Sequence, residues 1–396
     1  MTMQGYLRAD GRKGIRNLVA VAYLVECAHH VAREIAAPVR ERAHVIGFPG
    51  CYPNDYAQRM MERLCTHPNV GAVLLVSLGC ESFNRFRLEE AIRESGRAVE
   101  ALVIQQAGGT RPTIAAGRRW VAEALAALED TPRVEMTVSD LVVGTICGGS
   151  DGTSGLTGNP AAGRAFDRLV AAGATCIFEE TGELIGCEEI MAARAATPEL
   201  GEEIRAAVAK AARYYAALGH GSFAAGNAAG GLTTIEEKSL GAYAKSGRAP
   251  ISGLIKPGDI PPRGGLYLLD MVPDGEVRFG FPNINDNAEI VEMIASGAHL
   301  ILFVTGRGSV VGSALAPVIK IAANPDMYER LRDDMDINAG RILEGTASID
   351  TVGAEIHDLV LEVARGQRTG SEALGHQEFV LTYKSFTPLG PACLPA

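Results

Sequence analysis

Short apolar runs rich in Val, Ile and Leu recur along this chain, with glycine at or near their carboxyl ends. Such runs are typical of parallel strands buried on both faces of a sheet. Helical patterns lie between them, and this alternation predicts crossover units on a mostly parallel sheet. The predicted strands span residues 44–47, 72–78, 101–104, 141–146, 175–178, 266–271 and 300–305, and the predicted helices span 56–65, 88–95, 114–128, 161–172, 198–218 and 287–295.

The length of 396 residues predicts two or three domains, because a domain averages about 150 residues. A polar stretch at 129–139, which contains Pro132, separates a first α/β unit from a second. We predict an N-terminal domain over 1–134 and a C-terminal domain over 135–396, both Rossmann-like, with helices on both faces of a mostly parallel sheet. Residues 219–265 show little periodicity, which predicts a long active-site loop.

Composition and charge argue against several classes of protein. A net charge of -10 argues against a nucleic-acid groove or an anionic membrane face, since both require a basic excess. No apolar run reaches the roughly 18 to 20 residues that span a bilayer. The segment Leu18–Cys27 faintly resembles a signal peptide, but the positions of Asp10 and Glu26 do not fit one. Eight cysteines in so long a chain predict reduced thiols and a cytoplasmic location.

Three cysteines, Cys51, Cys80 and Cys147, each follow a predicted strand. Ligands of open parallel sheets gather beyond the carboxyl ends of the strands, so the three thiols are candidates for one site. Three soft ligands that leave one position open suit a Lewis-acid metal such as iron. Free cysteines are also among the most buried residues, so packing is the alternative interpretation.

The segment Cys147–Asn159 reads CGGSDGTSGLTGN and precedes a predicted helix. Exposed N–H groups in such a loop, together with the helix dipole, can hold an anion. The Gly-Lys-Ser/Thr ending of a Walker A loop is absent, and a plain glycine-rich turn is the alternative. The candidate substrate ligands in this loop are Gly148, Gly149, Ser150, Thr153 and Ser154.

A guanidinium group follows the predicted strand 300–305, in the segment Thr305–Ser309. Arg307 can grip a carboxylate or sulfonate through two parallel hydrogen bonds. We therefore predict Arg307 as the main substrate ligand, with Ser309 beside it.

The segment Gly226–Leu240 predicts a helix capped by Thr233 or Thr234 and carrying Lys238. Lys238 is a candidate cation or proton carrier above the strand ends, although a solvated helix start also explains its charge. The other candidate catalytic residues are His29, His30 and Asp151.

Six long blocks, in order along nearly the whole chain, resemble the altronate and galactarate dehydratase family of sugar-acid hydro-lyases. The resemblance implies metal-assisted elimination next to a carboxylate, typically with iron as the cofactor, in an oligomeric enzyme. The blocks are Gly5–Asn17, His67–Glu81, Cys147–Pro160, Glu179–Glu188, Gly230–Gly241 and Phe303–Gly312.

Two departures from the family pattern narrow the expected function. Typical members begin with a small separate domain that this chain lacks, which predicts a separate small subunit as partner. They generally carry a histidine just before the first Gly-Cys, whereas Pro49 stands here, which argues against loss of water from a sugar acid. This block and the segment His376–Pro395 resemble the branch of the family that cleaves sulfolactate, in which sulfite is the leaving group.

Two other classes of function are alternatives. A binding subunit that catalyses nothing would be expected to lose Cys80, Asp151 or Arg307, yet all three are present. A nucleotide-binding dehydrogenase would need Gly-x-Gly-x-x-Gly between an early strand and a helix, with an acidic residue at the expected distance, and the sequence has no such arrangement. A lyase that acts on a small anionic 2-hydroxy acid is therefore the predicted function.

Overall fold

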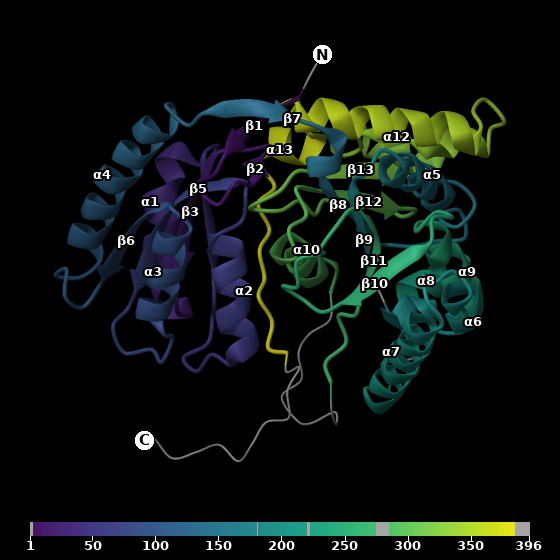
Figure 1. The fold of residues 1–396 in the computed structure, drawn as a ribbon, viewed down its shortest axis with the longest axis horizontal. Helices are drawn as coiled ribbons and strands as arrows, with labels where there is room; N and C mark the ends of the chain where they lie inside the picture. Colours follow the sequence, from purple (N-terminus) through teal and green to yellow (C-terminus); the bar gives the residue numbers. More distant parts are fainter. Residues whose placement is uncertain (1–2, 180, 220–221, 275–284, 385–396) are drawn as a thin grey trace.

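The computed structural model describes residues 3–179, 181–219, 222–274 and 285–384. Two units lie side by side, each built on a parallel sheet, with helix α12 along one edge of the larger unit (Figure 1). This arrangement confirms the predicted α/β class with parallel sheets. Within the described residues, no helix is long and apolar enough to cross a bilayer.

The first unit contains a four-stranded parallel sheet in the order β4-β3-β5-β6. Helices α1 and α4 pack on one face, and α2 and α3 pack on the other. The β3 strand is buried throughout, as expected of a central parallel strand. The elements are β3 (Leu18–Tyr23), α1 (Glu26–Ala36), β4 (Ala43–Gly47), α2 (Asp55–Cys65), β5 (Val70–Ser77), α3 (Arg85–Glu94), β6 (Ala98–Val103) and α4 (Thr110–Leu128).

The second unit contains a seven-stranded sheet in the order β10-β11-β9-β8-β12-β13-β14, with every pairing parallel. The strands are β8 (Val142–Cys147), β9 (Thr175–Phe178), β10 (Ile251–Ile255), β11 (Gly265–Leu269), β12 (Leu300–Thr305), β13 (Val318–Ala322) and β14 (Ile337–Asn338).

Helices cover both faces of this second sheet. Helices α5 and α12 pack on one face, while α10 lies on the other, toward the first unit. Helices α6 to α9 form a lobe beside β10 (Figure 1). The helices are α5 (Gly158–Ala171), α6 (Glu188–Ala192), α7 (Pro198–Ala217), α8 (Ala225–Ala229), α9 (Ile235–Ala244), α10 (Asp286–Ala295), α11 (Pro325–Arg330), α12 (Ile349–Ala364) and α13 (Gly370–Leu374).

The predicted long loop at 219–265 needs correction, because the structure places α8, α9 and β10 within it. The α9 helix begins as the sequence predicts, since the side chain of Thr234 accepts a hydrogen bond from the Glu237 N–H group. The weak periodicity reflects short elements that pack against neighbours on several sides.

A small antiparallel sheet joins the two units. It consists of β1 (Met3–Leu7), β2 (Lys13–Gly14) and β7 (Arg133–Met136), in the order β2-β1-β7. The β1 strand belongs to the start of the chain, whereas β7 lies on the connection between the two larger sheets, so their pairing ties that connection down.

One hydrophobic cluster spans the two units. Side chains from α2 and β5 of the first unit and from α10 and β12 of the second belong to a single buried cluster. The segment 376–384 runs between the units (Figure 1), where Phe379 and Leu381 pack against that cluster. The rest of the predicted closing block, residues 385–395, lies outside the described residues, as does Glu180.

Candidate active site

The site lies at the carboxyl ends of β8 and β12, two neighbouring strands of the large sheet whose following connections run in opposite directions. From β8 the chain passes to β9 on one side, whereas from β12 it passes to β13 on the other. A crevice forms at such a switch point, beyond the carboxyl ends of the strands. The two strand ends are joined there, because the Gly148 N–H donates to the Val304 carbonyl (3.0 Å) and the Arg307 N–H donates to the Gly149 carbonyl (3.0 Å).

Asp151 holds the glycine-rich loop in shape. Its Oδ1 accepts hydrogen bonds from the backbone N–H groups of Thr153 (2.9 Å) and Ser154 (3.0 Å), and from the Thr153 hydroxyl (2.6 Å). The Ser154 hydroxyl also contacts this oxygen, at 3.1 Å. The carboxylate and both hydroxyls, which we predict as catalytic or substrate-binding groups, thus bond to one another within the loop.

Cys147, the last residue of β8, is the centre of a buried polar cluster. Its Sγ lies 3.5 Å from the Ser150 hydroxyl, 3.4 Å from Lys245 Nζ and 3.9 Å from Asn159 Nδ2. It also lies 3.3 Å from Glu183 Oε2. Burial, reinforced by the charge of Glu183, raises the pKa of the Cys147 thiol. The sulfur is therefore a protonated thiol that donates to Glu183.

Glu183 forms ion pairs with two lysines, one partly exposed and one fully buried. Lys238 Nζ lies 2.5 Å from Glu183 Oε1, and the fully buried Lys245 Nζ lies 3.6 Å from Oε2. Burial tends to lower the pKa of Lys238, but the charge of Glu183 and its hydrogen bond outweigh burial, so the pKa is raised. Lys238 also donates to the Ser222 carbonyl (2.9 Å). Lys238 is therefore a fixed positive charge at neutral pH.

A cavity of about 260 Å³ opens beside this cluster. Backbone and small side chains of the glycine-rich loop form one wall, and α9 forms the other. Its lining residues are Cys147, Ser150, Asp151, Gly152, Ser154, Gly155, Leu156, Asn159, Leu232, Glu237, Lys238, Leu240 and Gly241.

Glycine is required at three positions around this loop. A Cβ atom at Gly148 would overlap the carboxylate of Asp286 and crowd the ring of Phe303, and one at Gly306 would overlap the carboxylate of Asp151. Gly149 has φ of 59°, which a residue with a side chain rarely adopts. The close approach of the β8 and β12 ends therefore depends on these glycines.

Arg307 and Ser309 lie at the rim of the site. The Arg307 guanidinium is exposed and donates through Nη1 to the Gly226 carbonyl (2.7 Å). The Ser309 hydroxyl accepts from the Val311 N–H (3.3 Å). Neither side chain lines the cavity, so Arg307 is placed to meet an anion at the entrance.

The structure does not bring His29 or His30 to this site. Both lie on α1 of the first unit, where the half-buried His29 has its Nδ1 3.0 Å from Glu26 Oε1 and the exposed His30 has its Nδ1 3.4 Å from Arg33 Nη2. Their positions in the sequence do not reveal that these two histidines lie beside the four-stranded sheet of the first unit rather than the seven-stranded sheet that carries the site.

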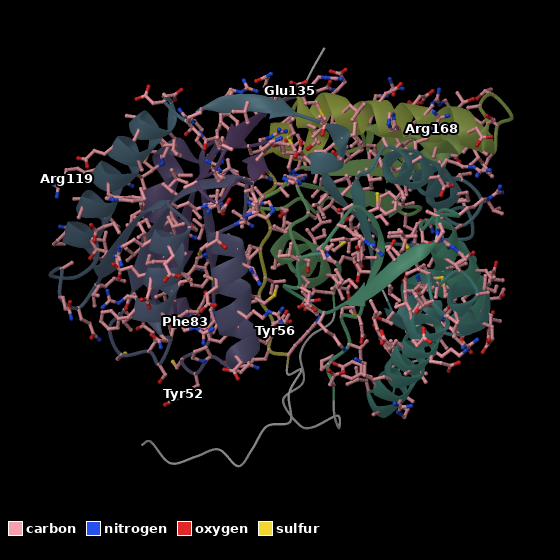
Figure 2. All side chains as sticks on the ribbon, viewed as in Figure 1. Tyr52, Tyr56, Phe83, Arg119, Glu135 and Arg168 are labelled. Carbon is pink, nitrogen blue, oxygen red and sulfur yellow. The ribbon has the colours of Figure 1, made fainter. Side chains whose placement is uncertain are left out.

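The three predicted thiol ligands are also separated. Cys51 and Cys80 are exposed in loops at the lower end of the first unit, near the labelled Tyr52 and Phe83 (Figure 2), whereas Cys147 belongs to the core of the second unit. Among the described residues, no group of three or more His, Cys, Asp or Glu side chains is suited to hold a metal ion. The residues present therefore do not fit a three-thiol iron site, because the strand ends belong to different sheets.

Several carboxyl groups, among them Asp286 and Glu289, lie behind the glycine-rich loop. Burial, followed by the charge of Glu183, raises the pKa of Asp286 to about 6. Burial also raises the pKa of Glu289 to about 8, where Asp286, Glu292 and Glu183 add to the effect and Lys384 opposes it.

These raised pKa values predict that stability falls as pH rises. The folded protein retains protons on Asp286 and Glu289 that the unfolded chain releases at its lower pKa values, so the fall spans about pH 4 to 8. We expect the melting temperature to decrease from pH 6 to pH 8. The variant Asp286→Asn/Glu289→Gln should show a smaller decrease, and the exposed control Glu236→Gln should behave like the original chain. An equal decrease in all three proteins would contradict the assignment.

Sequence reasoning did not single out Glu183, Lys245, Asn159, Asp286 or Glu289 as site residues. Glu183 and Asn159 stand inside blocks that carry the family resemblance, which is a usable signal. Lys245 and Glu289 have none, because a helical pattern does not indicate which charged residue faces a buried cluster.

Comparisons with known proteins identify the family of this chain. The D-galactarate/altronate dehydratase C-terminal domain matches residues 138–387, and the D-galactarate dehydratase/altronate hydrolase second domain matches residues 5–129. The chain is 33% identical to (2R)-sulfolactate sulfo-lyase subunit beta of Chromohalobacter salexigens, over 96% of this chain and 97% of that protein.

Two further relatives are dehydratases. Altronate dehydratase of Bacillus subtilis is 30% identical over 96% of this chain and 77% of that protein. Galactarate dehydratase (L-threo-forming) of Escherichia coli is 31% identical over 93% of this chain and 73% of that protein. The chain therefore belongs to the D-galactarate/altronate dehydratase family of lyases.

Proposed function

We propose that this chain is the large, catalytic subunit of a (2R)-sulfolactate sulfo-lyase, which converts sulfolactate to pyruvate and sulfite. The observation that carries the proposal is the cavity beside Lys238 and Glu183, which the glycine-rich loop lines on one side. Similarity over nearly the full length of a sulfo-lyase beta subunit supports this choice.

The charges of the site suit a substrate with two negative ends. Lys238 lines the cavity and is positively charged, so it can hold the carboxylate and make the neighbouring C2–H bond more acidic. The glycine-rich loop lines the same cavity and is the proposed binding place for the sulfonate, and Arg307 lies at the entrance.

Glu183 is the proposed proton acceptor. When the substrate carboxylate takes over the Lys238 ammonium group, the Glu183 carboxylate becomes available for the C2 proton. The C2–H electrons form the C2–C3 double bond, and the C3–S bond breaks with its electron pair leaving on sulfite. The resulting enol takes a proton at C3, loses the proton of its C2 hydroxyl and becomes pyruvate. Sulfite is a weak base, so its departure needs no strong acid.

An assay of purified protein tests this function. The chain, with and without the small subunit that we propose as its partner, is incubated anaerobically with sulfolactate, altronate or galactarate. Parallel samples contain added Fe²⁺, because the family resemblance predicts iron. We expect sulfite and pyruvate from sulfolactate, with higher turnover when both subunits are present.

The altronate and galactarate arms test the second candidate function, which similarity to the dehydratases favours. A higher kcat/KM for loss of water from either sugar acid would contradict the sulfolactate assignment and leave a family lyase. No turnover of any substrate by the two-subunit complex would contradict the catalytic role itself.

A further inference from the structure

A second cavity, of about 310 Å³, lies at the junction of the two units. It includes Leu18 and His44, near the amino ends of β3 and β4, and Pro317, just before β13. The candidate active site lies instead at the carboxyl ends of β8 and β12. The second cavity is therefore on the opposite edge of the sheets, remote from the proposed chemistry.

Four arginines and two glutamates line this second cavity, which leaves a net charge of two positive units. The excess is notable in a protein whose own net charge is -10. The charged lining residues are Arg16, Arg40, Arg42, Arg368, Glu41 and Glu372.

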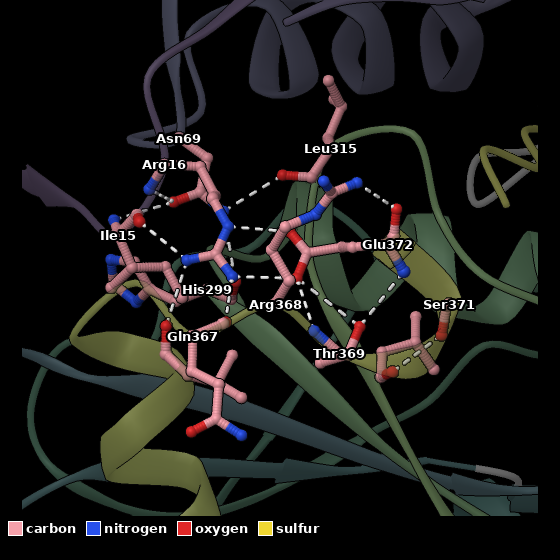
Figure 3. Close-up of polar contacts among 12 residues, drawn as sticks. Ile15, Arg16, Asn69, His299, Leu315, Gln367, Arg368, Thr369, Ser371 and Glu372 are labelled. Carbon is pink, nitrogen blue, oxygen red and sulfur yellow. Dashed lines mark hydrogen bonds and ion pairs between the residues drawn. The ribbon is translucent and has the colours of Figure 1, made fainter. Parts of the chain in front are cut away.

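Two of the four guanidinium groups are already neutralised. Arg16 binds Glu372 through two parallel bonds, from Nε (2.7 Å) and Nη2 (2.9 Å) (Figure 3). Arg42 pairs with Glu129 at 2.6 Å. This pair attaches α13 to the first unit. The negative charge of Glu372 is thus neutralised by Arg16 and does not neutralise the other arginines.

Arg40 and Arg368 supply the remaining positive charge, against which Glu41 is the remaining acidic residue of the lining. Within residues 3–384 as the structure describes them, neither has a carboxylate within ion-pair distance. Arg368 Nη2 donates to the Glu372 carbonyl (2.5 Å), which fixes its guanidinium beside the cavity. Arg40 lies in the first unit and Arg368 in the second, so an anion held by both would bridge the units.

A buried lysine adds positive potential behind the cavity wall. Lys320 is fully buried, and its nearest described carboxylate, Asp334, is 3.9 Å away. Its Nζ lies 3.3 Å from Nδ1 of His376, which lines the cavity. Lys320 therefore lies directly behind the part of the cavity wall that His376 forms.

We propose that this cavity binds a small organic anion with two or more carboxylate or phosphate groups, held between Arg40 and Arg368. A guanidinium group binds either kind of oxyanion through two parallel hydrogen bonds. The volume is at the lower end of the range for small-molecule sites, about 300 to 1,000 Å³. It accommodates a metabolite rather than an acidic stretch of another protein.

Binding there would stabilise the segment 376–384. His376 and Gln377 line the cavity, and the same segment continues to Tyr383, whose hydroxyl donates to the Tyr52 carbonyl (2.5 Å). Farther on, the Lys384 carbonyl accepts from Asn54 Nδ2 (2.6 Å). A ligand that holds the two units together at one end of this segment should therefore protect its backbone N–H groups from exchange.

Calorimetry and hydrogen exchange test the proposal on the full chain, without substrate. Citrate and pyrophosphate are titrated at constant ionic strength, with chloride and glycerol as controls. We expect saturable binding of at least one anion and slower exchange in 376–384. The variant Arg40→Gln/Arg368→Gln should bind at least about 100 times more weakly, since each arginine removed loses a hydrogen bond to a charged group worth about 1.5 to 3 kcal/mol, or about 10 to 100 times in affinity. Arg119→Gln, on the outer edge of α4 (Figure 2), should bind normally.

The anion that binds with the higher affinity, citrate or pyrophosphate, shows whether the cavity prefers carboxylate or phosphate groups. Unchanged affinity in the double variant would place the anion elsewhere, for example at Lys238, and would overturn the proposal. Absence of saturable binding would also overturn it. The proposal would likewise fail if the original chain bound no anion but bound a partner protein that the double variant no longer binds. If the double variant unfolds before it is titrated, the single variant Arg40→Gln gives the same comparison.

Discussion

Replacing Glu183 with Gln is expected to lower kcat/KM for sulfolactate by about two to four orders of magnitude, the usual contribution of a positioned general base. Gln keeps the shape and one hydrogen-bond acceptor for Lys238, but it cannot take up a proton. The effect should be mainly on kcat, because Lys238 remains to bind the substrate carboxylate. Steady-state kinetics of sulfite release by the complete enzyme measure it.

The control for this prediction is Glu236→Gln, an exposed change on the neighbouring helix α9. Its kcat/KM should equal that of the original chain. Because the Glu183→Gln change removes the carboxylate that Lys238 and Lys245 share, its melting temperature is measured first and the assay is run well below it. Activity within about a factor of three of the original enzyme would exclude Glu183 as the base.

Replacing Lys384 with Met is expected to destabilise the protein by about 3 to 5 kcal/mol, the usual result of leaving one partner of a buried ion pair uncompensated. Lys384 Nζ lies 2.7 Å from Glu292 Oε1, and both side chains are completely buried. Lys384 also donates to the Met271 carbonyl (3.1 Å). The Tyr56 hydroxyl donates to the same Glu292 oxygen (2.5 Å). Denaturant unfolding measures the change.

The double variant Lys384→Met/Glu292→Gln should recover most of this loss, since it removes the orphaned charge and preserves an acceptor for Tyr56. Arg332→Gln, which breaks an exposed pair with Glu329, should leave the unfolding midpoint unchanged. A double variant no more stable than Lys384→Met would show that lost packing, rather than an unpaired charge, causes the destabilisation.

The sequence alone predicted those elements whose pattern is local and repeated. The β8, β9 and β12 strands are apolar runs, and the helices between them show their period clearly, so their existence and order follow from burial. The Thr234 cap of α9 was also predictable, because a cap depends on residues a few positions apart. The meeting of the glycine-rich loop with Arg307 follows from the rule that parallel strand ends gather at one edge.

Tertiary structure decided which of these strand ends share a site. Cys51 and Cys80 end strands of one sheet and Cys147 ends a strand of another, and the apolar pattern of a strand carries no information about the sheet that it joins. The pairing of Lys238 with Glu183, and of Lys384 with Glu292, links residues far apart in the chain. The sequence shows that charged residues are available, but burial selects their partners, because a charge removed from water is tolerated only where the fold brings an opposite charge against it.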